Sequence, residues 1–359
     1  MPRASDLSAL RIADANANRC SEGLRVLEDI ARFVLDNSDL ASLLKELRHN
    51  IAKAVGKGLD DYVLMLSARR SEEDVGYKPS EDIADRSDLV ELVVANAKRV
   101  QQSLRVLEEL GRLPYFKIQA TAFFQSARYR CYQIEQQLVS LLTRRDKLDR
   151  LPGLYAVIDP EMVGAISVVE AARQAVLGGA SVVQLRDKKR ERGAVLQDAV
   201  GIKEICVELG AIFIVNDYPD VAVACAADGV HLGQKDMTVE AARKVLPFTA
   251  IIGRSTANVE EALKAVEEGV DYVAVGAIFP TGSKLDTRPA GLETLRKVRE
   301  VVSLPIVAIG GINADNLPQV VMAGADGVAI ISALLKQDDV REAASILTMR
   351  FKENYARPI

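Results

Sequence analysis

The chain has 359 residues, of which 49% are hydrophobic and 27% are charged, and its formal net charge at pH 7 is −4. These values are typical of a globular protein with two domains, and they argue against a nucleic-acid-binding protein, which is usually basic. The sequence shows neither a signal-peptide core nor an apolar run near the ~20 residues of a membrane helix, so we expect no membrane partner. Four scattered cysteines, Cys20, Cys131, Cys206 and Cys225, predict reduced thiols in a cytoplasmic protein.

Residues 4–150 predict helices, because glycines are few and apolar residues fall at helical spacing. A motif repeats in this half: residues 15–19, 24–28 and 32 return eighty positions later as 95–99, 104–108 and 112, and Arg48 returns as Arg128. Two similar helical hairpins usually bury their apolar faces against each other, so we expect an all-α bundle with an internal duplication. The repeat can also be a packing motif alone, with Arg–Glu pairs on its rim.

Two features of this half suggest a ligand. Polar residues recur at roughly helical spacing near the start of the chain, and a long polar link follows at 67–86, where arginines could hold a phosphate. The candidate residues are Asn16, Asn18, Arg19, Glu22, Arg25, Arg70 and Asp74. A solvated connector is the alternative interpretation of the link.

The segments 14–19, 22–29, 32–33 and 70–76 resemble a helical domain that is found fused to thiamine phosphate synthases. That family is associated with a monofunctional hydroxymethylpyrimidine-phosphate kinase, and the resemblance covers about residues 1–140. It implies that ATP is a substrate of this domain, although the sequence contains no Walker A loop and no protein-kinase Gly-rich loop. A non-catalytic module for oligomerisation or binding is the alternative, and in that case the protein could form a homo-oligomer.

The segment 141–151 is charged and is followed by Pro152 and Gly153, after which Val, Ile and Gly replace the Leu, Arg and Glu of the first half. We therefore place the domain break near Asp149 and expect domains at 1–148 and 149–359.

The second half alternates short β-branched runs with amphipathic helical stretches. The expected strands are 153–158, 181–185, 211–215, 229–232, 250–253, 272–275, 305–309 and 327–331. Eight β-α units of this length predict an α/β fold, a (β/α)₈ TIM barrel, with a doubly wound open sheet as the alternative.

Polar residues follow the second, third and fourth of these strands, and ligands of parallel α/β folds bind where strands end. The residues expected to face one mouth are Gln184, Arg186, Lys188, Asn216, Asp217 and Asp236. The cations suit a phosphate, and the carboxylates of Asp217 and Asp236 suit one Mg²⁺ ion, so a Mg²⁺-diphosphate substrate would use both sets.

Later strand ends add further candidates. Gly311 after the seventh strand, with Ile331 and Ser332 after the eighth, predicts a phosphate site on backbone N–H groups. The loop 276–289 predicts a mobile flap, or else an exposed connector. Ser255 offers a hydroxyl that could equally cap a helix. His231 lies in an apolar strand, where a lone histidine is more often a hydrogen-bonded core residue than a catalyst.

These motifs, together with 229–236, 253–256 and 276–288, resemble thiamine phosphate synthase over essentially the whole second domain. One departure is Ala257, where relatives often carry histidine. The resemblance implies that hydroxymethylpyrimidine diphosphate and thiazole phosphate, both small-molecule partners, are joined with release of diphosphate. A thiazole tautomerase, which needs no Mg²⁺, is the alternative on the same barrel.

The resemblance also implies the role of each candidate. Arg186, Lys188 and Lys284 would be catalytic by stabilising charge on the leaving diphosphate, with Mg²⁺ on Asp217 and Asp236. Thiazole phosphate would bind at Gly311, Ile331 and Ser332. The residues expected to bind substrate are Gln184, Leu185, Arg186, Asp187, Lys188, Asn216, Ser255, Thr281, Gly282, Ser283, Lys284, Gly311, Ile331 and Ser332.

Overall fold

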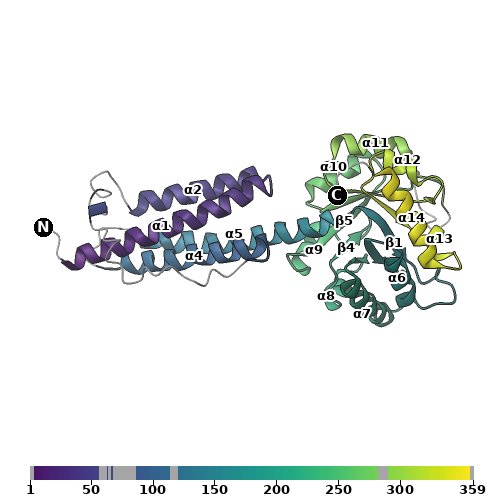
Figure 1. The fold of residues 1–359 in the computed structure, drawn as a ribbon, viewed down its shortest axis with the longest axis horizontal. Helices are drawn as coiled ribbons and strands as arrows, with labels where there is room; N and C mark the ends of the chain where they lie inside the picture. The colour runs from purple at the N-terminus through teal and green to yellow at the C-terminus, as the bar shows by residue number, and fades with distance from the viewer. Residues whose placement is uncertain are drawn as a thin grey trace. The chain divides into compact units, whose positions relative to one another are not determined.

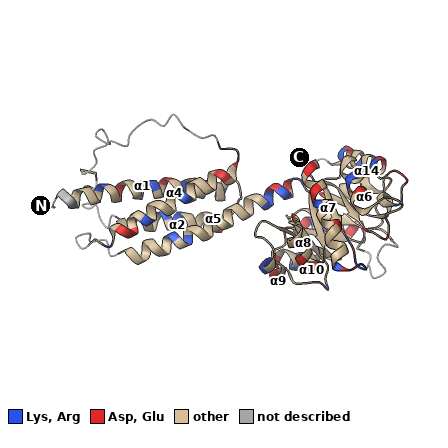
Figure 2. Cartoon of the chain, turned by 90° about the horizontal axis from the view of Figure 1, so that it is seen from below, with Lys and Arg blue, Asp and Glu red and all other residues tan. Residues whose placement is uncertain are grey.

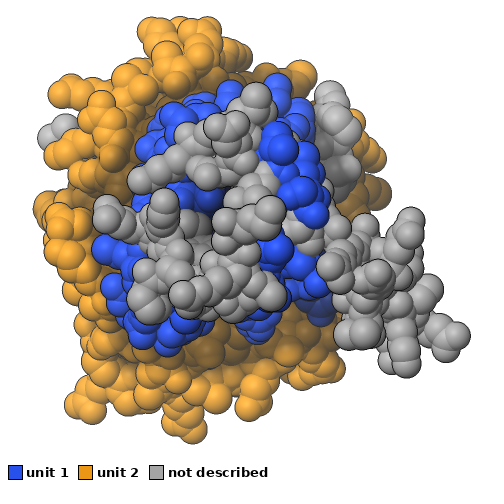
Figure 3. All heavy atoms as spheres, turned by 90° about the vertical axis from the view of Figure 1, so that its left-hand side faces the viewer, with its two compact units in different colours: residues 1–143 blue, residues 144–359 orange. Residues whose placement is uncertain are grey.

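The computed structural model describes residues 4–55, 63, 66–67, 86–113, 120–281 and 290–355. The chain divides into two compact units, Met1–Thr143 and Arg144–Ile359, which are coloured separately in Figure 3. The first unit is helical, and the second is a closed barrel of eight parallel strands, as the sequence predicted (Figure 1). The division between the units falls within helix α5 (Thr121–Asp149), whereas the sequence placed the break near the end of this helix.

The described part of the first unit contains helices α1 (Ala4–Phe33), α2 (Ser38–Val55), α4 (Leu89–Leu110) and most of α5. Helices α1 and α4, which carry the two copies of the repeated motif, pack directly on each other. Gly23 permits this close approach, because a Cβ atom there would lie 2.7 Å from the Val100 side chain. The core between the helices consists largely of leucines and small residues that occupy equivalent places in the two copies.

Each copy of the motif buries one glutamate that receives an arginine from the following helix. The Arg48 guanidinium lies 3.0 Å from the Glu28 carboxylate, and the equivalent Arg128 lies 3.0 Å from Glu108. Both carboxylates are almost fully buried, so a charge left there without its partner would be costly. The duplicated Arg–Glu pairs are therefore part of the packing that holds the bundle together.

The barrel strands run in chain order, each hydrogen-bonded in parallel to the next, and β1 closes the sheet against β8. The strands are β1 (Gly153–Ile158), β2 (Val182–Leu185), β3 (Ile212–Asn216), β4 (Gly229–Leu232), β5 (Ile251–Thr256), β6 (Tyr272–Gly276), β7 (Ile306–Ile309) and β8 (Gly327–Ile330). Nearly every strand residue is buried, because the strands contact side chains inside the barrel and helices outside it.

Helices alternate with the strands and cover the barrel (Figure 1). They are α6 (Val168–Leu177), α7 (Arg192–Leu209), α8 (Pro219–Ala224), α9 (Val239–Val245), α10 (Val259–Glu267), α11 (Gly291–Val301), α12 (Leu317–Met322), α13 (Ser332–Leu335) and α14 (Val340–Asn354). None of the helices in the described ranges combines the length and apolarity of a membrane span.

At the N-terminal edge of the barrel, the same bond pattern repeats at three strand pairs. Asp228, Asp271 and Asp326 each stand just before an even-numbered strand. The N–H of each donates to a carbonyl in the preceding strand, and its carboxylate accepts the N–H of that same residue at 2.7–2.9 Å. A helix cation completes each group: Lys203, Arg243 and Arg299 respectively. We call these three groups the aspartate ties.

The last turns of α5, which carry both basic and acidic residues (Figure 2), belong to the barrel unit and reach two of these ties. Arg144 donates to the Asp271 carboxylate at 2.9 Å. The Lys147 ammonium donates to the backbone oxygens of Thr249 and Asp228 at 2.9 and 3.3 Å. The end of α5 is therefore integrated into the N-terminal edge of the barrel.

Candidate active site

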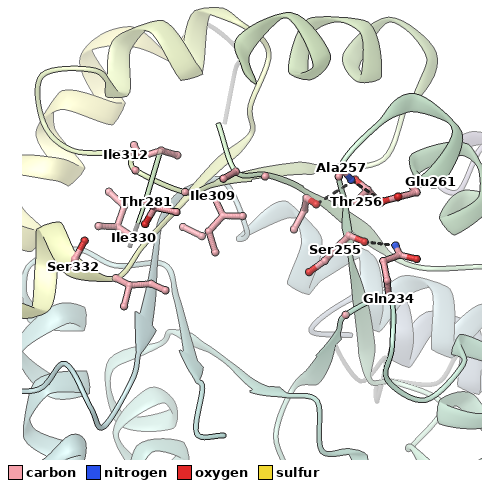
Figure 4. A pocket seen from close by; sticks show the side chains of 18 of the residues that line it. Gln234, Ser255, Thr256, Ala257, Glu261, Thr281, Ile309, Ile312, Ile330 and Ser332 are labelled. Atoms are coloured by element: carbon pink, nitrogen blue, oxygen red, sulfur yellow. Dashed lines mark hydrogen bonds between the residues drawn. The ribbon is translucent and has the colours of Figure 1, made fainter. Parts of the chain in front are cut away.

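A cavity of about 570 Å³ lies at the C-terminal ends of strands β5 to β8 (Figure 4). Its lining includes five of the residues predicted to bind substrate: Ser255, Thr281, Gly311, Ile331 and Ser332. These residues come from segments that are distant in sequence, and they meet because all parallel strands end at the same edge of the barrel. We call this space the outer cavity.

The glycines after β7 shape one wall of the outer cavity. Gly310 and Gly311 both have positive φ values, +105° and +64°, and a Cβ atom at Gly311 would lie 2.7 Å from the Pro280 carbonyl oxygen. The chain can therefore make this turn only with glycine, which leaves backbone rather than side chain facing the cavity. Such a wall suits a phosphate that binds to main-chain N–H groups.

A second, much smaller cavity of about 20 Å³ lies within the barrel mouth, and Ser255 lines both cavities. Its polar lining includes the predicted residues Gln184, Arg186 and Asn216, together with His231 and two tyrosines, Tyr155 and Tyr272. We call it the inner cavity. The two cavities share the lining residues Ser255, Ala274, Ile309 and Ala329, so they adjoin and form one site with an inner polar part and an outer part walled by glycine.

Arg186 projects from the end of β2 and forms an ion pair with Asp159, at the end of β1. Within the described part of the chain, its Nε–H group is buried and has no hydrogen-bond partner. A buried N–H without an acceptor is uncommon and is easily satisfied by a ligand oxygen. Asp159 was not among the predicted residues, although it follows a strand directly, as Asp217 does.

Asp217 and Asp236 come together as predicted, beside Lys188. Asp217 follows β3 in the left-handed conformation, with φ of 64°, and Lys188 lies 3.0 Å from its carboxylate. Asp236 accepts the N–H of Gly233 at 2.7 Å. Burial raises the pKa of the Asp217 carboxyl, and the neighbouring Asp236 raises it further, whereas Lys188 opposes the shift.

The raised pKa means that the charge on Asp217 lacks a sufficient counter-charge, which a divalent cation would supply. Oxygen ligands of this kind suit a hard ion such as Mg²⁺. Among the described residues, no three His, Cys, Asp or Glu side chains gather around one point. An ion on this pair would therefore take its remaining ligands from substrate oxygens and water, which is usual for Mg²⁺.

Leu185 and Asp187 do not line either cavity, because side chains alternate along the chain and Gln184 and Arg186 take the inward places. The Asp187 carboxylate instead accepts the N–H groups of Lys189 and Arg190 at 3.1 and 3.0 Å. Burial alone would raise its pKa, but these bonds and the Arg190 side chain lower it overall. Asp187 therefore shapes the loop that presents Lys188.

Gln234 and Glu261 also line the outer cavity but were not predicted (Figure 4). Gln234 donates to the Ser255 carbonyl, and Glu261 accepts the Ala257 N–H at 2.8 Å. The predicted residues Gly282, Ser283 and Lys284 lie outside the described residues, as do Arg70 and Asp74 of the first unit.

The other first-unit candidates lie along α1. Asn16 is buried and its side chain donates to the Ile12 carbonyl at 2.8 Å, which is a packing role. Asn18, Arg19, Glu22 and Arg25 are exposed. Asn18, Glu22 and Arg25 follow each other at intervals of four and three residues, so they share one face of the helix.

The second copy carries a hollow of about 350 Å³ at the equivalent position on α4 and α5. It is lined by Lys98, Gln101, Gln102, Arg105, Arg128 and Tyr132. Arg105 lies 2.7 Å from Glu108 and 2.6 Å from Glu109, whereas the equivalent distances from Arg25 are 3.7 and 3.4 Å. The arginine of the first copy is therefore less tightly engaged by its own helix.

Comparison with known proteins gives a match in each half of the chain. A family described as thiamine monophosphate synthase matches residues 154–334, and one described as the ThiD2 family matches residues 11–137. A thiamine-phosphate synthase from Synechocystis sp. is 41% identical over 357 residues, covering 99% of this chain and 100% of the relative. One from Methanocella arvoryzae is 52% identical over 192 residues, covering 53% of this chain and 91% of the relative.

Among solved structures, a thiamine phosphate pyrophosphorylase from Pyrococcus furiosus resembles the chain with a TM-score of 0.53 and 41% identity. The match covers 58% of this chain and 98% of the Pyrococcus chain.

Proposed function

The chain belongs to the thiamine-phosphate synthase family, and we propose that its barrel joins hydroxymethylpyrimidine diphosphate to thiazole phosphate with release of diphosphate. The observation that carries this proposal is the junction of the two cavities at Ser255. The polar side chains of the inner cavity suit the polar edge of a pyrimidine whose ring would extend into the larger outer cavity, and the glycine wall of the outer cavity suits a molecule that ends in phosphate. Two substrates in adjoining spaces would have their reacting atoms side by side.

In the reaction, the bond from the pyrimidine methylene carbon to the diphosphate oxygen breaks, and the thiazole nitrogen forms the new bond to that carbon. Gln184 and Ser255 would orient the pyrimidine, while the backbone at Gly311 and Ser332 would hold the thiazole phosphate. Arg186, whose Nε–H has no partner among the described residues, and Lys188 would stabilise the negative charge that develops on the departing diphosphate. No side chain needs to form a covalent intermediate.

Asp217 and Asp236 would hold a magnesium ion, which when bound supplies positive charge to the diphosphate. Lys284 would add a further cation at the same place. The acidic pair also distinguishes the proposed synthase from a thiazole tautomerase, which has no diphosphate to balance.

The test is diphosphate release by the full chain with both substrates and Mg²⁺. We expect the wild type to release diphosphate and Asp217→Ala to lower the rate by at least about 100-fold, because a group that stabilises the leaving charge is lost. Asp220→Ala, which removes an exposed aspartate on α8, should retain the wild-type rate. Near-wild-type turnover of Asp217→Ala in saturating Mg²⁺ would contradict the metal role, and no release by the wild type would contradict the synthase.

For the first unit, we propose a kinase that transfers phosphate from ATP to hydroxymethylpyrimidine phosphate and so makes the diphosphate substrate of the barrel. The ThiD2 family match over residues 11–137 supports this proposal, as does the exposed polar face of α1. A non-catalytic module that oligomerises or binds a partner is the competing proposal, and the duplicated, tightly packed helices favour it.

An ADP-release assay on the full chain distinguishes these two proposals. With ATP and pyrimidine phosphate but no thiazole phosphate, we expect ADP release, and Arg25→Ala should lower it at least about tenfold by removing a phosphate ligand. Arg105→Ala is the matched control, since it removes the equivalent arginine of the second copy, and it should stay within about twofold of wild type. Absence of ADP release from the wild type would support the non-catalytic module.

A further inference from the structure

A chain of hydrogen bonds crosses the inside of the barrel from β2 to β5. Gln184 donates to the Tyr155 hydroxyl at 2.8 Å, and the Tyr155 and Tyr272 hydroxyls lie 2.9 Å apart. The Tyr272 hydroxyl lies 3.1 Å from Nδ1 of His231, whose Nε2 lies 2.9 Å from the Ser255 hydroxyl. The two ends of this relay are Gln184 and Ser255, both of which line the inner cavity.

The direction of the relay follows from the hydrogens that its members carry. Burial raises the pKa of both Tyr155 and Tyr272, so each phenol is neutral and has one hydrogen to donate. The Tyr155 oxygen already accepts from Gln184. If its own hydrogen goes to Tyr272, the hydrogen left without a protein acceptor is that of Ser255, which is half-buried and lines the outer cavity, whereas Tyr155 is fully buried. In the opposite direction the Tyr155 hydrogen would need another acceptor, and no further contact of that hydroxyl is seen among the described residues.

The remaining steps are then fixed. Tyr272 donates to Nδ1 of His231, so Nδ1 carries no hydrogen and the neutral ring carries its hydrogen on Nε2. Nε2–H donates to the Ser255 oxygen. The Ser255 hydrogen is therefore left to point at a ligand, and the carbonyl oxygen of Gln184 is left as an acceptor.

We propose that Tyr155, Tyr272 and His231 are positioning residues that give Gln184 and Ser255 opposite hydrogen-bond character toward the ligand. Such a pair would bind a flat heteroaromatic ring with an amino donor on one side, facing Gln184, and a ring-nitrogen acceptor on the other, facing Ser255. An aminopyrimidine has this pattern. The inference rests on the proposed condensation for its ligand, but the relay itself does not depend on turnover.

Tyr272→Phe is a clean test, because it breaks the relay and keeps the ring. The ring packs against Gly253, where a Cβ atom would lie 2.0 Å from the phenol carbon that carries the hydroxyl, so phenylalanine fits the same place. We expect the KM for pyrimidine diphosphate to rise about tenfold, with the KM for thiazole phosphate within about twofold of wild type. A purely structural role would lower thermal stability without separating the two KM values.

Tyr355→Phe is the matched control, since it deletes a tyrosine hydroxyl that donates to Asp326 at the other edge of the barrel. It should leave both KM values unchanged. A wild-type KM for pyrimidine diphosphate in an active Tyr272→Phe enzyme would overturn the relay, whereas a wild type that releases no diphosphate would overturn the proposed function instead.

The second measurement is ¹⁵N NMR of the histidine side chains, which needs no substrate. The protein has two histidines, His49 and His231, so a His49→Gln variant assigns both. We expect neutral His231 with its hydrogen on Nε2, and a shift toward mixed tautomers in Tyr272→Phe. A hydrogen on Nδ1, or a doubly protonated ring, in the wild type would overturn the inference.

Discussion

Asp217 combines three features that make an aspartate unfavourable in a folded protein. Its side chain is only 9% exposed, its backbone is left-handed, and a second carboxylate, Asp236, raises its pKa in addition to burial. The exposed Lys188 offsets this charge only in part, because solvent screens such a pair. The residue therefore costs stability, which a cation bound as proposed would restore.

Asp217→Asn should consequently stabilise the protein when divalent ions are absent. Asparagine keeps the shape and accepts the left-handed conformation, but it removes the buried charge. If the relief is about 1 kcal/mol, the barrel transition in thermal unfolding should rise by roughly 2–4 °C in EDTA. Mg²⁺ should raise the wild-type transition and leave the variant unchanged, since only the wild type would bind it.

The difference in stability between the wild type and Asp217→Asn should change with pH in one direction. A carboxyl whose pKa is raised on folding favours the folded state at low pH, and this contribution is lost as pH rises through the folded pKa. The advantage of Asp217→Asn over wild type should therefore shrink as pH falls. Asp220→Asn is the control, and a lower transition for Asp217→Asn in EDTA would contradict this account.

At the scale of elements, the end of α5 acts as part of the barrel. Arg144 is one of two arginines on Asp271, and burial lowers its pKa while Asp271 opposes that shift. Lys147 is held in the same way against Asp228, with burial lowering its pKa. Burying these two cations costs free energy of desolvation. Their contribution to stability comes from the hydrogen bonds that they donate to the carbonyl and carboxylate oxygens at this edge of the barrel.

Arg144→Ala should lower the free energy of unfolding of the barrel by about 1–2 kcal/mol, because Asp271 keeps Arg243 but loses a buried donor. Arg145→Ala supplies the matched control on the same turn of helix, since Arg145 is about half exposed and its pair with Asp149 spans 3.9 Å. The control should change stability by less than about 0.5 kcal/mol. The free energy of unfolding of each variant is measured by chemical denaturation, with a spectroscopic signal that reports on the barrel. Equal effects of the two substitutions would contradict the docking role of α5.

For the molecule as a whole, the barrel could be predicted because each buried strand is a short apolar run followed by polar residues at one edge. The same rule gave Gln184, Arg186, Asn216, Asp217, Asp236 and Ser255, which the structure brings to one mouth. Leu185 and Asp187 were predicted because they belong to the same motif as Gln184 and Arg186. The alternation of side chains directs them away from the cavities.

The relay could not be predicted in this way. Tyr155 and Tyr272 stand 117 residues apart in apolar strands, where a tyrosine that packs and one that hydrogen-bonds across a barrel have the same local pattern. Asp159 was missed for a related reason, since its partner Arg186 comes from another strand. His231, expected as a hydrogen-bonded core residue, has that environment. Pairings that depend on closure of the sheet become visible only in three dimensions.

The aspartate ties give the barrel a period of two strands. They join β3 to β4, β5 to β6 and β7 to β8, and each carries its own cation from an adjoining helix. A circular permutation that opens the chain between β4 and β5, or between β6 and β7, would leave all three ties intact. Three successive strand pairs thus each carry a bond group that does not depend on the chain connection to the next pair.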